Sequence, residues 1–347
     1  MNLNHSPLVA IDLAKNSFQI CLFDKNGKIK SNKAMTRKAL IVFLSNLSPS
    51  IVAMESCGGS HYWARLAMKC GHNVKVMNSK IVKAFRINQK TDKNDAVAIG
   101  IAAQMPHIRS CAILTEQTQG LQSISRVRDL KITFKTALTN QIRGLLLEFG
   151  IVINKGDNHL IKEMPFILED AENNLPDNFR LLLASQKEAL DGLIEQIVFL
   201  DKQIAQQVNN DVISKKLMAL EGVGPIAALG LAIRLGSGTE FINGRDASAA
   251  IGLTPKQHST GGKERIGHIA KNNSDKRLRS NLFQGALSVV SIISKREPRT
   301  IKERWLKAVI ERRGMKIAAI ALANKTVRTA VAIIKNNTEY QPIKLSA

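Results

Sequence analysis

The sequence predicts an α/β domain with a mixed sheet at the front of the chain, followed by two mainly helical regions. Three observations predict this order. Short apolar runs alternate with segments of helical spacing up to about residue 105, long segments with few helix breakers continue to residue 210, and glycine-punctuated helical segments occupy the rest. We therefore expect domains at residues 1–112, 113–210 and 211–347.

The front region contains four short apolar runs. Residues 8–14 and 17–24 predict a pair of strands, followed by a turn at 25–27, and residues 51–54 and 74–77 predict two more strands. Residues 60–69 and 79–88 between and after them have helical spacing. A strand pair followed by strand–helix–strand indicates a sheet with both antiparallel and parallel neighbours.

The middle region predicts two long helices. The first covers about residues 117–149, and the second carries an apolar seam of Leu190, Leu193, Ile197, Leu200 and Ile204. These alternating three- and four-residue steps are typical of a coiled coil. The helices could pair within one chain or between subunits, and both interpretations stay open. Residues 151–180 are expected to form a polar, partly irregular connection.

The charge of the chain indicates its kind of partner. Fifty Lys and Arg residues against 28 Asp and Glu residues give a net charge of +22. Such a surplus attracts polyanions, and binding to phosphates is favoured by counterion release. No charge-free stretch is long enough to span a bilayer, and no secretory signal precedes the first strand. We expect a cytoplasmic, nucleic-acid-binding protein without a membrane partner.

Four acids are candidates for a metal site. Asp12 and Glu55 end predicted strands, and Asp92 and Asp95 lie three residues apart where a helix begins. A carboxylate cluster repels itself without cations, which indicates hard ions such as Mg²⁺ or Mn²⁺. Two such ions can activate a nucleophile and stabilise a leaving oxygen at a phosphodiester. The alternative for Asp92 is a helix cap.

Residues 217–229 predict a helix, a tight Gly222-Val223-Gly224 turn and a second helix. One interpretation is a helix-hairpin-helix, in which the glycines let backbone N–H groups approach a phosphate without reading sequence. A plain pair of helices is the equally weighted alternative.

The densest signal is a glycine-rich, basic segment at residues 252–279, which we interpret as a loop that leads into a basic helix. Arginine forks hold phosphate oxygens well, and the candidate nucleic-acid-binding residues here are Lys256, Lys263, Arg265, Lys271, Arg277 and Arg279. Ser259 is a candidate nucleophile. In an extended segment His258 points away from it, so adjacency does not make His258 the base.

Taken together, these motifs resemble the DEDD transposases of bacterial insertion sequences, a group that includes pilin-gene invertases and bridge-RNA-guided recombinases. The resemblance covers nearly the whole chain. It rests on VAIDLAKNSF, AMESCGGSHYWARLA and KTDKNDAVAI in the first third, and on LEGVGPIAA, IGLTPKQHSTGGKERIGHIAKNNSDKRLR and KIAAIALANKTVR in the last. The order and spacing of these segments make the match specific.

The resemblance implies a RuvC-like front domain with an RNase H fold, whose four acids match Asp12, Glu55, Asp92 and Asp95. The family's nucleophilic serine matches Ser259, although many members carry two serines where this chain has Ser259-Thr260. It further implies a covalent protein–DNA link, Mg²⁺ held by the acids, donor and target double-stranded DNA, a bridge RNA, and a homo-oligomer that is a dimer or tetramer associated with the nucleoid.

Two other functions remain open. A structure-selective nuclease or junction resolvase would use the acids, two metals and water without the serine. A non-catalytic nucleic-acid-binding protein would keep the fold alone.

Overall fold

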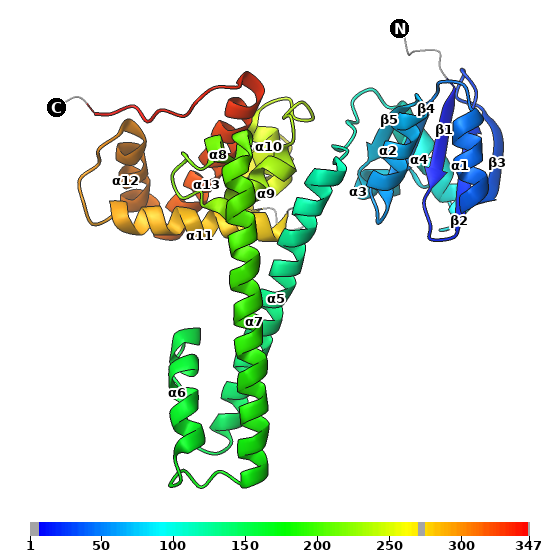
Figure 1. Ribbon diagram of the computed structural model, residues 1–347. Helices are drawn as coiled ribbons and strands as arrows, with labels where there is room; N and C mark the ends of the chain where they lie inside the picture. Colours follow the sequence, from blue (N-terminus) through cyan, green and yellow to red (C-terminus); the bar gives the residue numbers. More distant parts are fainter. Residues whose placement is uncertain (1–6, 270–274, 346–347) are drawn as a thin grey trace. The chain divides into compact units, whose positions relative to one another are not determined.

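The structure is a computed structural model that describes residues 7–269 and 275–345, apart from the side chain of residue 157. It divides into two compact units, Met1–Gln119 and Gly120–Ala347 (Figure 1). Each unit is described by itself. The helical middle predicted for residues 113–210 belongs mostly with the second unit, because Ile204 and Val208 are part of its main core.

The first unit is built on a five-stranded sheet in the order β3-β2-β1-β4-β5. The strands are β1 (Leu8–Asp12), β2 (Ser17–Phe23), β3 (Ile29–Thr36), β4 (Ile51–Glu55) and β5 (Asn73–Met77). β1, β2 and β3 are antiparallel neighbours, whereas β1, β4 and β5 run parallel. The predicted mixed sheet is therefore confirmed.

Helices cover both faces of this sheet. They are α1 (Arg37–Asn46), α2 (Ser60–Lys69), α3 (Ser79–Phe85) and α4 (Asp92–Gln104). Alternate residues of β1 enter two separate cores, as expected because successive side chains of a strand point to opposite faces. Val9 and Ile11 pack in the core that holds residues of α1 and α2, and Leu8 and Ala10 pack in the core that holds residues of α3 and α4.

One glycine lets α4 lie close to the sheet. A Cβ atom on Gly100 would come within 2.1 Å of the Phe23 ring of β2. The absence of a side chain at residue 100 therefore sets how closely α4, with the acids at its start, approaches the strands.

The second unit is mainly helical, as predicted. Its helices are α5 (Glu116–Leu147), which starts at the unit boundary, α6 (Asp157–Glu169), α7 (Asp177–Asn210), α8 (Val212–Leu217), α9 (Pro225–Leu235), α10 (Gly244–Ile251), α11 (Lys276–Ile293), α12 (Ile301–Arg313) and α13 (Met315–Asn336). The main core joins the end of α7 to α8–α13. The unit also contains a hairpin of β6 (Pro255–Thr260) and β7 (Lys263–Ile269).

The connection expected at residues 151–180 is partly irregular, at 151–156 and 170–176, but α6 lies between these two stretches. Leu160 and Met164 lie one turn apart on α6 and are fully buried. They pack with Ile142 of α5 and Leu183 of α7 in a small separate core. The apolar residues of α6 therefore pack against α5 and α7 and form a small three-helix core.

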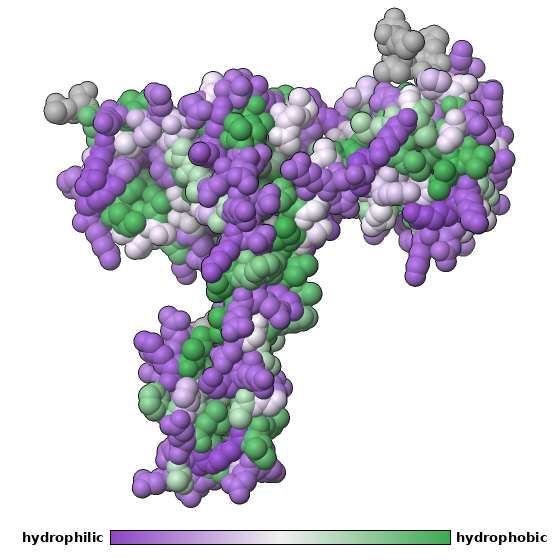
Figure 2. Space-filling view, viewed as in Figure 1, coloured by the Kyte–Doolittle hydropathy of each residue, from purple (hydrophilic) through white to green (hydrophobic). Residues whose placement is uncertain are grey.

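The predicted seam on α7 is buried only at its ends. Leu190 and Ile204 lie in the two cores, while the seam residues between them are half-buried. Large apolar side chains are exposed on these two helices: Val127, Leu130 and Phe134 of α5 and Val198 and Phe199 of α7. Figure 2 shows hydrophobic residues gathered on the surface of the long helical part of this unit. We call these five residues the α5–α7 apolar strip.

The longest apolar helix of the described residues is α13. By length and composition it could cross a membrane, but half of the relevant stretch is buried inside the unit. Ala318, Leu322 and Val327 contribute to the main core. Its apolar character is therefore accounted for by packing within the second unit.

Candidate active site

Two of the four predicted acids lie side by side at one edge of the sheet. β1 and β4 are parallel and in register, with Ile11 opposite Met54, so their last residues, Asp12 and Glu55, follow at adjacent positions. Both side chains are half-buried. The strand ends therefore place two carboxylates together where the apolar strands stop.

The other two acids lie in the first turn of α4. Thr91 caps this helix, because its side chain accepts a hydrogen bond from the Asn94 N–H. Asp92 is thus not the cap that the alternative interpretation assigned to it, and its side chain is exposed. Asp95, one turn further, is largely buried, with 15% of its side chain exposed.

The electrostatics show that the four acids share one neighbourhood. Burial, and after it the charges of Asp95, Asp92 and Glu55, together raise the pKa of Asp12 from an ordinary 3.8 to about 6. Burial and then the charge of Asp95 also raise the pKa of Glu55. Neighbouring carboxylates thus oppose the ionisation of Asp12 and of Glu55.

Two cations that the sequence reasoning missed lie against this cluster. Arg86 Nη1 is 3.0 Å from Asp95 Oδ1 and donates a hydrogen bond to it, and Lys90 Nζ is 3.6 Å from Asp95 Oδ2. Both charges lower the pKa of Glu55. In the sequence, only the position of Arg86 and Lys90 shortly before Asp92 could have indicated that they lie near the acids.

The donor set suits a hard divalent cation, because it offers only carboxylate oxygens. Across the part of the chain that is described, no three acid, His or Cys side chains converge closely enough to hold a metal ion. Asp95 instead points to Arg86. The chemistry of the residues thus fits Mg²⁺, while a metal would have to compete with Arg86 for Asp95.

A chain of polar side chains ties the start of α4 to the sheet. Gln19, which is the β2 neighbour of Asp12, donates to Asn32 Oδ1 at 2.6 Å. Asn32 Nδ2 in turn donates to the Lys93 carbonyl at 3.0 Å. These two bonds hold the first turn of α4 over the strands that carry Asp12. We call Gln19, Asn32 and the Lys93 carbonyl the α4 anchor.

The segment with Ser259 is a β-hairpin and not the predicted loop, whereas the basic helix predicted after it is present as α11. Ser259 lies on β6 opposite Glu264 of β7. Gly261 and Gly262 form the two-residue turn with φ of 56° and 78°, the left-handed conformation that glycine adopts most easily. Every residue of β6 is exposed, and the extended backbone directs His258 and Ser259 to opposite faces, as expected.

The predicted nucleic-acid-binding cations differ in their surroundings. Lys256, Lys263 and Arg265 are exposed on the hairpin, and Arg279 on α11 is half-buried. Arg277 donates to Thr133 Oγ1 of α5 at 2.6 Å. Lys271 lies outside the described residues. The hairpin thus presents its basic side chains to solvent, whereas Arg277 links α11 to α5.

The two glycines between α8 and α9 have separate environments. Gly222 has a φ of 75° and packs against the α11 backbone, where a Cβ atom would lie 2.6 Å from the Gly285 carbonyl oxygen. Gly224 is exposed, and no atom comes within 4 Å of a Cβ atom built on it. Gly222 therefore serves packing inside the unit, and Gly224 is the glycine open to solvent.

The front unit, with its mixed sheet and edge acids, is consistent with a DEDD, RNase H-like domain. Residues 9–151 match a family described as transposase, and residues 214–302 match the transposase IS116/IS110/IS902 family. The chain belongs to this IS110/IS116 family of insertion-sequence transposases.

Relatives align along almost the entire chain. A probable family 20 transposase of Pseudomonas aeruginosa is 36% identical over 343 residues, which cover 99% of this chain and 100% of that protein. The transposase for insertion sequence element IS1328 of Yersinia enterocolitica is 34% identical, covering 96% and 98%. The transposase for IS1111A of Coxiella burnetii is 33% identical, covering 96% and 91%.

Proposed function

We propose that this transposase cuts and rejoins double-stranded DNA with two sets of groups, the four acids of the front unit and the hydroxyl of Ser259. The observation that carries the proposal is the position of Asp12 and Glu55 at adjacent strand ends, near enough to the start of α4 that the charges of Asp92 and Asp95 act on Asp12. Family membership supports DNA as the substrate, and the net charge of +22 favours binding to its phosphates.

In the proposed reaction, the Ser259 oxygen attacks a phosphorus atom of the DNA backbone. The bond to one bridging oxygen breaks, that oxygen leaves with a proton, and a serine–phosphodiester link forms. Attack by the freed hydroxyl of another strand reverses the exchange, releases the serine and rejoins the DNA. Mg²⁺ or Mn²⁺ held by the acids would supply positive charge for the phosphate oxygens. The acid and serine groups would have to meet in the assembled complex.

A homo-oligomer, dimer or tetramer, is part of the proposal. The α5–α7 apolar strip supports it, because exposed large apolar side chains grouped on two adjoining helices favour burial against another subunit. A bridge RNA as guide is a further part. The exposed cations of the hairpin support polyanion binding in general, and an assay for co-purifying RNA tests this part directly.

The decisive experiment compares Ser259→Ala with Thr260→Ala, which removes the neighbouring hydroxyl on the same hairpin. Each purified full-length variant is incubated with Mg²⁺ and donor and target DNA, and covalent protein–DNA adducts are trapped by denaturation. We expect Ser259→Ala to abolish adduct and strand transfer, and Thr260→Ala to keep both. Transfer by Ser259→Ala at the wild-type rate would refute the serine mechanism.

The same variants test the alternative of a metal-dependent nuclease. The front unit has its own hydrophobic core on each face of the sheet and carries all four acids. This favours a hydrolytic domain that folds independently. A nuclease of this kind would retain cleavage in Ser259→Ala and lose it in Asp12→Ala. A non-catalytic binding protein would show neither cleavage nor dependence on Asp12.

A further inference from the structure

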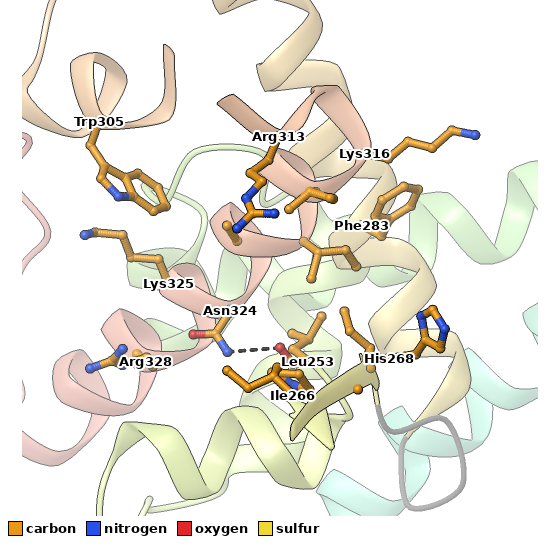
Figure 3. A pocket seen from close by; sticks show the side chains of 16 residues that line it. Leu253, Ile266, His268, Phe283, Trp305, Arg313, Lys316, Asn324, Lys325 and Arg328 are labelled. Carbon is orange, nitrogen blue, oxygen red and sulfur yellow. Dashed lines mark hydrogen bonds between the residues drawn. The ribbon is translucent and has the colours of Figure 1, made fainter. Parts of the chain in front are cut away.

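The second unit contains a cavity of about 900 Å³ that the proposed reaction does not use (Figure 3). Its walls come from the hairpin, from α11 and α12, and from one face of α13. On α13 the lining residues Ile317, Ile320, Asn324 and Arg328 follow the three- and four-residue spacing of one helix face. On this face Ile317 and Arg328 are exposed, and Ile320 and Asn324 are half-buried.

The floor of the cavity is apolar. Leu253 is buried there, and Phe283 and Ile320 are half-buried. Asn324 Nδ2 donates to the Leu253 carbonyl at 3.0 Å, which fixes the segment that leads into β6 against α13. Ile266 of β7 also lines the cavity although 76% of it is exposed. Apolar side chains are thus held open to solvent at a preformed site.

The rim is cationic. Arg313, Lys316, Lys325 and Arg328 line the cavity together with His268, and the lining has no Asp or Glu among the residues that the structure describes. All four Lys and Arg side chains are exposed. Figure 3 shows Arg313 between Trp305 on one side and Phe283 on the other. An apolar floor under an all-cationic rim suits a ligand with flat apolar groups and several negative charges.

Trp305 adds an aromatic surface. The Lys325 ammonium lies 4.5 Å from the centroid of the Trp305 ring, so a positive charge and an aromatic side chain occur together at the edge of the cavity. Proteins that hold single-stranded nucleic acid combine these elements: bases stack on aromatic rings and the cations follow the phosphates.

We propose that this cavity binds an unpaired base of a single-stranded nucleic acid, with the four rim cations holding the phosphates on either side of it. The inference rests on the proposed function for its ligand class. A segment of a second copy is disfavoured, because it would bring another strongly basic chain, of net charge +22, against a rim without acids.

The experiment measures binding of fluorescein-labelled oligo(dT) and oligo(U) of about 12 nucleotides, within the usual site size, to the full-length protein. Each is compared with the same strand carrying abasic sites at its centre and with a duplex. We expect the abasic strand to bind at least about five-fold more weakly, as loss of one stacked base implies. Whichever of oligo(dT) and oligo(U) binds more tightly shows whether the cavity takes its base from DNA or from RNA.

Variants then locate the site. Arg313→Gln should weaken binding of the normal strand and reduce the difference from the abasic strand. Arg312→Gln is the matched control, because Arg312 is an exposed neighbour on α12 that does not line the cavity. Tryptophan emission should be quenched by the normal strand in the wild type and much less in Trp305→Phe.

Equal binding of normal and abasic strands by the wild type would overturn the inference, even if a variant failed to fold. The inference would also be overturned if Arg313→Gln and Arg312→Gln lost the same amount of affinity for the normal strand. Strand transfer by Ser259→Ala is measured alongside. If Ser259→Ala loses strand transfer but the wild type binds normal and abasic strands equally, only the cavity proposal is refuted. If Ser259→Ala keeps strand transfer and the wild type prefers the normal strand, only the serine mechanism is refuted.

Discussion

Gly222 and Gly285 bring two backbones into direct contact: a Cβ atom on Gly285 of α11 would lie 1.9 Å from the Gly222 carbonyl oxygen. Gly285→Ala should therefore force α11 away from the turn between α8 and α9. We expect a loss of about 2–3 kcal/mol in the free energy of unfolding, measured by urea denaturation. Gln284→Ala, at an exposed neighbour, should change it by less than about 0.5 kcal/mol. Equal effects would contradict the contact.

Asp12 should make the stability of the protein depend on pH when metal is removed by chelation. Its pKa is raised to about 6 in the folded protein, so the folded state binds the proton more tightly than the unfolded chain. The resulting stability is complete below about pH 4 and is lost as pH rises through 6.

Asp12→Asn should consequently be more stable than the wild type at pH 8, by about 1–2 kcal/mol after allowance for solvent screening. The difference should shrink towards zero near pH 4. Thermal denaturation across this pH range, with chelator present, measures it. A difference that is the same at both ends of the range would contradict the raised pKa.

The α4 anchor should position Asp92 and Asp95 for metal binding. Asn32→Ala removes both hydrogen bonds of the anchor and should weaken Mn²⁺ binding about ten-fold, as loss of supporting hydrogen bonds at metal sites does. Calorimetric titration with Mn²⁺ measures the affinity. Lys33→Ala, an exposed neighbour on β3, is the control, and equal affinities in the two variants would rule out the positioning role.

The α5–α7 apolar strip should support self-association. Phe134 is 48% exposed and Phe199 is 61% exposed, so replacing both with Ser removes apolar area that a partner subunit would bury. Light scattering coupled to size exclusion should show a shift towards the monomer mass. Asn140→Ala, at an exposed polar position of α5, should leave the mass unchanged. An unchanged mass in the double variant would exclude the strip from the interface.

The sequence was informative where apolar runs end in charged residues. The strands β1 and β4 are almost entirely apolar, so their positions and the placement of Asp12 and Glu55 at their ends were predictable. The polar edge strand β3 was not predicted, because an edge strand with exposed side chains shows no apolar alternation. Helix α1 was missed as well, although Leu40 and Leu44 on it show helical spacing.

The hairpin was missed for a related reason. Residues of β6 and β7 carry few apolar side chains, so only the Gly261-Gly262 pair signalled a turn. The contacts of Asp95 with Arg86, and of Asn32 with Lys93, depend on how separate elements pack. Such contacts between segments far apart in the chain, and the cavity beside Trp305, cannot be read from local pattern.

The full exposure of β6 has an energetic consequence. A lone two-stranded hairpin is only marginally stable in water, and its outer edges leave backbone N–H and C=O groups for another molecule to pair with. A molecule that pairs with the free edge of β6 would hydrogen-bond to the backbone on either side of Ser259. Binding at that edge would therefore restrict the motion of the strand that carries the Ser259 hydroxyl.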